Sequence, residues 1–220
     1  MPLQDRDVQL KKFLPYMERF LHSIPGAKAA VIVVEQSQDG NQFNRGQLLN
    51  VGFRLAQELL PDMTSFITHD VDLLPSMEMR PVYANPPSSG SAVHLASVWP
   101  KYSYDSFLGG VLSFCPGDFL RVNGYPNDYW GWGLEDDQLA LRMAHHKLRT
   151  LRVRVGSYVD LDPLNMKAVL ESRQKEEIRK HLPWYNKNMF RSSGLSLDTN
   201  WSSNGLSNLD AWRVIERRSE

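Results

Sequence analysis

Two short runs of acidic residues have the types and spacing that metal-assisted or acid–base chemistry requires. The first is Asp70-Val71-Asp72, which comes directly after an apolar, strand-like run at residues 65–68. The two acids occupy alternate positions, which share one face as a strand ends, so one carboxylate can face a substrate while its neighbour reaches a divalent ion. Oxygen ligands favour hard cations such as Mn²⁺ or Mg²⁺. By itself the tripeptide is also typical of a solvated turn.

The second acidic run follows an unusual segment rich in tryptophan and glycine. The whole segment reads Tyr129-Trp130-Gly131-Trp132-Gly133-Leu134-Glu135-Asp136-Asp137. Its alternation of tryptophan and glycine fits neither a helix nor a strand; glycine lets the backbone bend, and an indole face can stack on a sugar ring. The three acids open a predicted helix, whose N-terminal dipole favours their ionised form. The alternative interpretation is a helix cap with a packed tryptophan turn.

The overall composition predicts a single domain without a nucleic-acid partner. The 220 residues can bury a sizeable core, and 25 basic residues balance 25 acidic ones, which excludes a polycationic surface for nucleic acid or acidic lipid. The sequence contains no run of about 20 apolar residues and no charged, apolar leader, so we expect no membrane segment in this chain. The single cysteine, Cys115, excludes an internal disulfide, and its apolar neighbours predict a buried, inert thiol.

Hydrophobic periodicity predicts alternating helices and strands. We expect helices over residues 10–21, 44–60 and 136–146, the second capped by Asn44 with Gln47, ended by Pro61, and burying Leu59 and Leu60. We expect strands at residues 29–34, 65–68, 92–98, 108–115 and 149–155, the first buried on both faces. This order predicts an α/β fold with a mixed, mostly parallel sheet flanked by helices. Beyond residue 162 we expect one charged helix around residues 167–181, a mobile loop and a peripheral tail.

Further short motifs join the two acidic runs in a fixed order. They are Pro2 to Arg6, Phe43-Asn44-Arg45, Leu48-Leu49-Asn50-Val51-Gly52-Phe53, Asp70-Val71-Asp72-Leu73-Leu74-Pro75, Gly109-Gly110-Val111, Asn123-Gly124-Tyr125-Pro126-Asn127 and the Trp-Gly-Trp-Gly-x-Glu-Asp-Asp run. Together they resemble the animal β-1,4-galactosyltransferases of glycosyltransferase family 7. The resemblance covers residues 2–156, and a weaker match lies at Asn204-Gly205-Leu206.

The resemblance implies the nucleotide-sugar transferase fold called GT-A, with UDP-galactose as the donor. It divides the single domain into a nucleotide-binding part at residues 1–75, a sugar- and acceptor-binding part at 76–165 and a peripheral tail at 166–220. The uridine and diphosphate would be held by Pro2, Arg6, Phe43 and Arg45. The donor sugar would be surrounded by Asp70, Gly110, Trp132 and Glu135. Asp72 would bind Mn²⁺, Asp136 would be the catalytic base, and Asp137 would help to hold the acceptor.

The chemistry of one-step inversion agrees with these assignments. The acceptor oxygen must attack opposite the leaving diphosphate, so a base and a metal must lie on opposite sides of the reacting carbon. Asp136 and Asp72 could supply them. A carboxylate whose pKa is kept low by a helix end is a weak base, but it is ionised and can take the proton late in the reaction. General-base help of this kind typically raises the rate ~10²- to 10⁴-fold. The metal would neutralise the departing diphosphate as a Lewis acid.

The sequence departs from the family pattern at three places. Met1 directly precedes Pro2, where relatives place a hydrophobic strand, so we expect either a truncated chain or a substitute segment. Where relatives carry a histidine metal ligand after the last strand, this chain has Asp160 and Asp162, which predict either substitute oxygen ligands or an ordinary acidic turn. Phe107, counted among the acceptor-side residues, replaces a tyrosine near the second carbon of the donor sugar, so UDP-GalNAc is an alternative donor.

The sequence therefore predicts an inverting, metal-dependent β-1,4-galactosyltransferase acting on a saccharide acceptor such as xylose, GlcNAc or Glc. The short chain without disulfide cysteines favours the xylosylprotein (proteoglycan-linker) type. Two alternatives remain open: a non-catalytic sugar- or nucleotide-binding relative, and a hydrolase with paired acids. The resemblance places the activity in the Golgi lumen.

Overall fold

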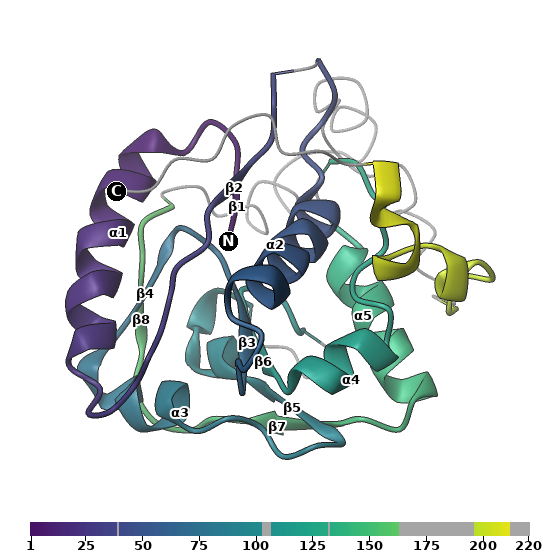
Figure 1. The fold of residues 1–220 in the computed structure, drawn as a ribbon. Helices are drawn as coiled ribbons and strands as arrows, with labels where there is room; N and C mark the ends of the chain where they lie inside the picture. Colours follow the sequence, from purple (N-terminus) through teal and green to yellow (C-terminus); the bar gives the residue numbers. More distant parts are fainter. Residues whose placement is uncertain (39, 103–106, 132, 163–195, 212–220) are drawn as a thin grey trace.

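The chain folds into a mixed α/β structure in which helices cover both faces of a central sheet (Figure 1). The computed structural model describes residues 1–38, 40–102, 107–131, 133–162 and 196–211. Its elements in chain order are β1 (Pro2–Leu3), α1 (Asp7–His22), β2 (Val34–Glu35), α2 (Arg45–Leu59), β3 (Phe66–His69), β4 (Leu73–Pro75), η1 (Met77–Met79), α3 (Arg80–Ala84), β5 (Ser91–His94), η2 (Leu95–Val98), η3 (Pro100–Tyr102), β6 (Val111–Phe114), α4 (Pro116–Arg121), α5 (Glu135–His145), β7 (Arg149–Arg152), β8 (Tyr158–Asp160), η5 (Trp201–Ser203) and η6 (Leu206–Ala211), where η marks a 3₁₀ helix.

The central sheet has the strand order β3-β6-β5-β7. β6 runs antiparallel to both β3 and β5, while β5 and β7 are parallel. Two small pairs complete the described strands: β1 and β2 are parallel, and β4 and β8 are antiparallel. The mixed sheet is confirmed, but the expectation of mostly parallel pairing is wrong for the described strands, because β6 opposes both of its neighbours.

Side chains of the central sheet alternate between two hydrophobic cores. Phe66, Ala92 and Leu112 face the core beneath α2, α4 and α5, whereas Ile67 and Val93 face the core beneath α1. This period of two is the pattern of a strand buried on both faces. Burial on both sides fixes the register of β3, β5 and β6, and therefore the positions of the loops at their ends.

The helices begin and end close to the predicted residues. In α1, Phe13, Met17 and Phe20 form the buried stripe. α2 begins after Asn44, whose side chain accepts a hydrogen bond from the Gln47 backbone N–H at 2.9 Å, so the predicted cap is confirmed. The expected reciprocal contact from the Gln47 side chain is wrong, because the Asn44 N–H donates to Gln36 Oε1 at 2.9 Å. The prediction that Leu59 and Leu60 are buried is wrong: they are 58% and 40% exposed, because the last turn of α2 lies at the surface.

Several predicted strands are shorter than expected. Residues 29–34 contribute only Val34 to a strand; residues 29–31 are exposed, because β2 pairs with the two-residue β1 over just two positions. The run at 92–98 turns into the 3₁₀ helix η2 after His94. The run at 108–115 begins its strand only at Val111, after the turn at Gly109 and Gly110. Cys115 precedes α4 and is half-buried instead of buried.

The last described segment packs against the core instead of forming a peripheral tail. Leu206 and Leu209 are buried in the core beneath α2, and Asn204 is buried as well. The fully buried Arg142 of α5 donates hydrogen bonds to the carbonyls of Asn123, Gly124 and Asn204 at 3.1, 2.9 and 2.7 Å. The expectation of a peripheral tail is therefore wrong for residues 204–209, and the expected helix at 167–181 lies outside the described residues. None of the described helices is long and apolar enough to cross a membrane.

Candidate active site

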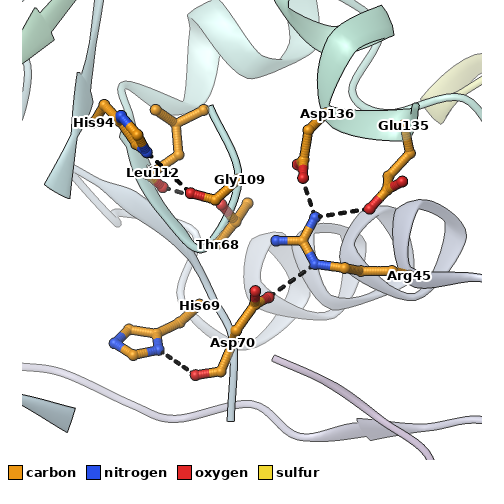
Figure 2. Close-up of polar contacts among 9 residues, drawn as sticks. All are labelled: Arg45, Thr68, His69, Asp70, His94, Gly109, Leu112, Glu135 and Asp136. Atoms are coloured by element: carbon orange, nitrogen blue, oxygen red, sulfur yellow. Dashed lines mark hydrogen bonds and ion pairs between the residues drawn. The ribbon is translucent and has the colours of Figure 1, made fainter. Parts of the chain in front are cut away.

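The two acidic runs of the sequence meet at one arginine (Figure 2). Arg45, the first residue of α2, donates from Nε to Asp70 Oδ1 at 2.8 Å. Its Nη1 donates to Asp136 Oδ1 at 2.9 Å and lies 3.4 Å from Glu135 Oε1. A single guanidinium thus joins the end of β3 to the first turn of α5, and Arg45 with these three acids forms the Arg45 cluster.

Close packing at the start of α2 sets the position of Arg45. A Cβ atom on Gly46 would lie only 2.7 Å from the carbonyl oxygen of Pro126, so the start of α2 is pressed against the segment that leads into α5. The Asn44 side chain donates to the carbonyl of Asn127 at 2.7 Å, and the backbone N–H of Gly131 donates to the carbonyl of Phe43 at 2.8 Å. The motifs around Asn44 and Asn127 therefore act as spacers that hold Arg45 against the acids.

Burial controls the ionisation of the cluster. Burial and the neighbouring Asp136 raise the pKa of Glu135 to about 8, against the opposing effect of Arg45. Burial likewise raises the pKa of Asp136, although Arg45 lowers it in part. Burial alone would lower the pKa of Arg45, but Asp136 and Asp70 outweigh it and keep the guanidinium charged. The expectation that the helix end keeps the pKa of these carboxylates low is wrong, because desolvation exceeds the helix dipole.

A second group of acids surrounds Asp72. β4 and β8 pair Leu73 with Asp160, and the backbone N–H of Leu161 donates to the carbonyl of Asp72 at 2.7 Å, so Asp160 and Asp162 lie beside it. Burial, with repulsion from Asp70 and Asp160, raises the pKa of Asp72 to about 7. The buried Oδ1 of Asp72 has no hydrogen-bond partner among the described residues. A buried carboxylate oxygen without a donor, surrounded by further carboxylates, fits a hard divalent cation.

Lys101 approaches the same acids from η3. Its Nζ lies 2.9 Å from Asp160 Oδ2 and 3.7 Å from Asp162 Oδ2. In the part of the chain that the structure describes, no three histidine, cysteine or acidic side chains are grouped as a metal site as they stand. The acids around Asp72 thus have the oxygen ligands that a hard divalent cation prefers, while Asp160 and Asp162 are paired with the ammonium group of Lys101.

The turn at Gly109 and Gly110 lies directly against Asp136. A Cβ atom on Gly109 would come within 2.6 Å of both Asp136 Oδ2 and the ring of Phe107. His94 supports this turn: its Nε2 lies 2.9 Å from the carbonyl of Gly109 (Figure 2). Arg152 Nη1 in turn lies 2.9 Å from His94 Nδ1. Because arginine only donates, Nδ1 accepts and the Nε2–H donates to Gly109. Burial lowers the pKa of His94 to about 4, so the ring is neutral.

The structure brings most of the predicted site residues to the Arg45 cluster or to the acids around Asp72. Asp70, Glu135 and Asp136 meet at Arg45, and the Gly110 carbonyl accepts from the Asp70 backbone N–H at 3.1 Å. Asp137 is half-buried in the first turn of α5. Pro2 lies in β1 and Arg6 caps α1, and the contacts of the described residues do not join either side chain to the Arg45 cluster. Trp132 lies outside the described residues.

Two residues of the site were missed in the sequence. His94 is the one ionisable residue in a mostly apolar run expected to be a strand, and that signal alone could have drawn attention to it. Lys101 has no local signal, because its partners Asp160 and Asp162 come from a distant strand pair.

Comparison with known proteins identifies the family. Residues 1–85 match the profile described as the N-terminal region of glycosyl transferase group 7, and residues 90–163 match the one described as the N-terminal domain of galactosyltransferase. The solved structure of a mutant Drosophila β-1,4-galactosyltransferase 7 in complex with manganese, UDP-Gal and xylobiose is 31% identical, with a TM-score of 0.71 over 94% of this chain and 81% of that one. This chain belongs to glycosyltransferase family 7. The expected GT-A fold is confirmed by the same similarity.

Curated relatives of this family 7 chain are similar over the same part. The xylosylprotein 4-beta-galactosyltransferase of Caenorhabditis elegans is 39% identical over 155 residues, which is 70% of this chain and 52% of the relative. The β-1,4-galactosyltransferase 7 of Drosophila melanogaster is 40% identical over 155 residues, 69% of this chain and 46% of the relative. The chain therefore spans about half the length of the curated relatives that it matches.

The contact between Gly109 and Asp136 gives a test of the site's packing in this family 7 chain. Gly109→Ala should lower the free energy of unfolding by about 2 kcal/mol, because the new methyl group must displace the Asp136 carboxylate or the Phe107 ring. Urea denaturation followed by circular dichroism measures this. Gly117→Ala is the matched control: outside its own helical turn, no atom of the described residues lies within 4 Å of the place that its methyl group would take. Because Gly117 lies in α4, this change should be neutral or slightly stabilising. Equal stability of both variants would contradict the packing described.

Proposed function

We propose that this chain transfers galactose from UDP-galactose to the hydroxyl of a terminal sugar, forming a β-1,4 linkage with inversion in a metal-dependent reaction. The observation that carries the proposal is the Arg45 cluster, which joins Asp136 to Asp70, two residues before the buried carboxylate of Asp72. The names of the relatives support it: one is a xylosylprotein 4-beta-galactosyltransferase, and a solved relative holds manganese, UDP-Gal and xylobiose.

Asp136 is the general base of the proposed reaction. Its Oδ1 accepts from Arg45, which leaves Oδ2, on the side of Gly109, to take the proton of the acceptor hydroxyl. The acceptor oxygen forms a bond to the anomeric carbon as the bond from that carbon to the diphosphate oxygen breaks. Because burial raises the pKa of Asp136, its carboxylate is a stronger base than an exposed aspartate. Asp137, in the same turn, would help to hold the acceptor.

Arg45 links the base to the donor side of the site. Its Nη2 is buried and has no hydrogen-bond partner among the described residues. This N–H group can donate to an oxygen of the bound donor while Nε and Nη1 hold the acids. Pro2, Arg6 and Phe43 would hold the rest of the nucleotide. The donor sugar would be surrounded by Asp70, Gly110, Trp132 and Glu135.

Asp72 would hold the metal together with Asp160 or Asp162. The preferred ion is Mn²⁺, and an all-oxygen donor set also admits Mg²⁺. When bound, the ion supplies Lewis-acid neutralisation of the diphosphate as it leaves. Both acids of the 160–162 turn remain candidates, because both lie within 4 Å of the same ammonium group.

Two further assignments belong to the proposal. The chain divides into a nucleotide-binding part at residues 1–75, a sugar- and acceptor-binding part at 76–165 and a remaining part at 166–220, of which Leu206 and Leu209 belong to the core. By similarity to relatives named for xylosylprotein or solved with xylobiose, the acceptor is a xylose-type sugar. The Golgi lumen, where the family resemblance places the activity, is the proposed compartment.

Asp136→Asn tests the base. The wild type should release UDP from UDP-galactose only with both Mn²⁺ and an acceptor sugar. In the variant, the rate of UDP release should be lower by at least about 10²-fold, because the general base is lost. Asp7→Asn, an exposed acid in the first turn of α1, is the matched control and should retain full turnover. Absence of turnover in the wild type would favour a non-catalytic binding relative. Release that needs no acceptor would favour a hydrolase.

Phe107 tests the choice of donor. Its ring lies beside Gly109, next to Asp136. Phenylalanine lacks the hydroxyl group with which a tyrosine would crowd or hydrogen-bond the group on the second carbon of the donor sugar. We expect the wild type to use UDP-GalNAc as well as UDP-galactose, and Phe107→Tyr to reduce the UDP-GalNAc rate about tenfold relative to UDP-galactose. Rates of UDP release with each donor measure this ratio. Strict rejection of UDP-GalNAc by the wild type would defeat the assignment.

A further inference from the structure

Lys101 occupies a largely buried position between an aromatic ring and two carboxylates. Its side chain is 11% exposed, and Nζ lies 5.5 Å from the centre of the Trp99 ring. On the other side, Nζ lies 2.9 Å from Asp160 Oδ2 and 3.7 Å from Asp162 Oδ2. Trp99 is itself buried, which limits where the ammonium group can go. The lysine is therefore held against the acids, in contrast to a mobile surface lysine.

The oxygens that bind Lys101 belong to the two acids that are the candidates for holding a metal with Asp72. The turn at 160–162 is fixed beside Asp72 by the pairing of β4 with β8 and by the bond from the Leu161 N–H to the Asp72 carbonyl. Asp72 Oδ1 is buried without a hydrogen-bond partner among the described residues, while Asp160 is bound by Lys101. Asp160 and Asp162 are thus paired with an internal cation, whereas Asp72 is paired with none of the described cationic side chains.

We propose that Lys101 competes with the divalent cation for Asp160 and Asp162 and thereby sets the metal affinity of the site. This inference rests on the proposed function, in which Asp72 holds the metal. The ammonium group neutralises the acidic turn when no metal is bound, and it must leave when Asp160 or Asp162 turns toward a metal. Because an ammonium group and a divalent ion also repel each other, the two cations exclude one another at this turn.

The competition has a simple quantitative consequence. If the paired form of Lys101 is the main form of the metal-free protein, the apparent Kd for the metal is the intrinsic Kd divided by the fraction in which the ligands are released. Removal of the ammonium group abolishes this penalty. A paired population of about 90% corresponds to a change of about tenfold in Kd. The inference also accounts for the presence of metal-compatible acids that are not yet arranged as a metal site in the described residues.

Direct Mn²⁺ binding to the full chain, without a sugar donor, tests the inference. Electron paramagnetic resonance of free Mn²⁺ gives the Kd. Lys101→Met should bind Mn²⁺ about tenfold more tightly than the wild type. Lys101→Arg keeps the charge and should bind like the wild type, and Lys11→Met removes a charge from the exposed face of α1 as a matched control. Thermal unfolding of each variant verifies folding, and Lys101→Gln gives a second neutral variant.

The outcomes separate this inference from the proposed function. Asp72→Asn should abolish Mn²⁺ binding. If it does, and Lys101→Met and Lys101→Gln bind Mn²⁺ as weakly as the wild type or more weakly, the role of Lys101 is refuted and the metal site stands. If Asp72→Asn binds Mn²⁺ as tightly as the wild type, the metal site at Asp72 is wrong and the role of Lys101 falls with it. Tighter binding by both neutral variants supports the competition.

Discussion

The ion pairs of Arg45 are the interaction on which the rest of the site depends. Asp70, Glu135 and Asp136 come from the end of β3 and the start of α5, and the single positive charge of Arg45 offsets part of their negative charge. Burying three carboxylates without this partner would leave uncompensated charge in a medium of low dielectric constant. Even with Arg45, burial holds the pKa of Glu135 near 8 and raises that of Asp136. The same desolvation that makes the cluster costly would make Asp136 a stronger base in the proposed reaction.

The surrounding fold keeps this cluster in place through contacts between distant segments. Buried asparagines join α2 to the loop before α5: Asn50 donates to the carbonyl of Tyr125 and to Asn127, both at 2.8 Å. Arg142 ties α5 to the same loop and to residue 204. His94 and Arg152 hold the Gly109 turn against Asp136 from the other side. Removal of any one of these supports would change the geometry of the reacting groups without touching a ligand.

The sequence predicts those features that depend on neighbouring residues. The cap at Asn44, the acids after β3 and the helix that begins at the second acidic run all follow from local patterns, and the structure shows each of them. Features set by distant contacts could not be predicted. The exposure of residues 29–31 depends on how little of β1 pairs with β2, and the burial of Leu206 depends on α2. The raised pKa of Asp136 and the pairing of Lys101 with Asp160 likewise arise only when separate elements meet.

In the proposed reaction, Asp72 and Asp136 act on one bound donor, from opposite sides of its reacting carbon. A crystal structure of the chain with Mn²⁺ and UDP, with data collected at the manganese absorption edge, is the sharpest test of this arrangement. We expect one anomalous peak bonded to a carboxylate oxygen of Asp72 and to the diphosphate, with Asp136 still paired to Arg45 across the same cavity. A peak away from Asp72, or a diphosphate bound in a cavity that Asp136 does not face, would contradict it.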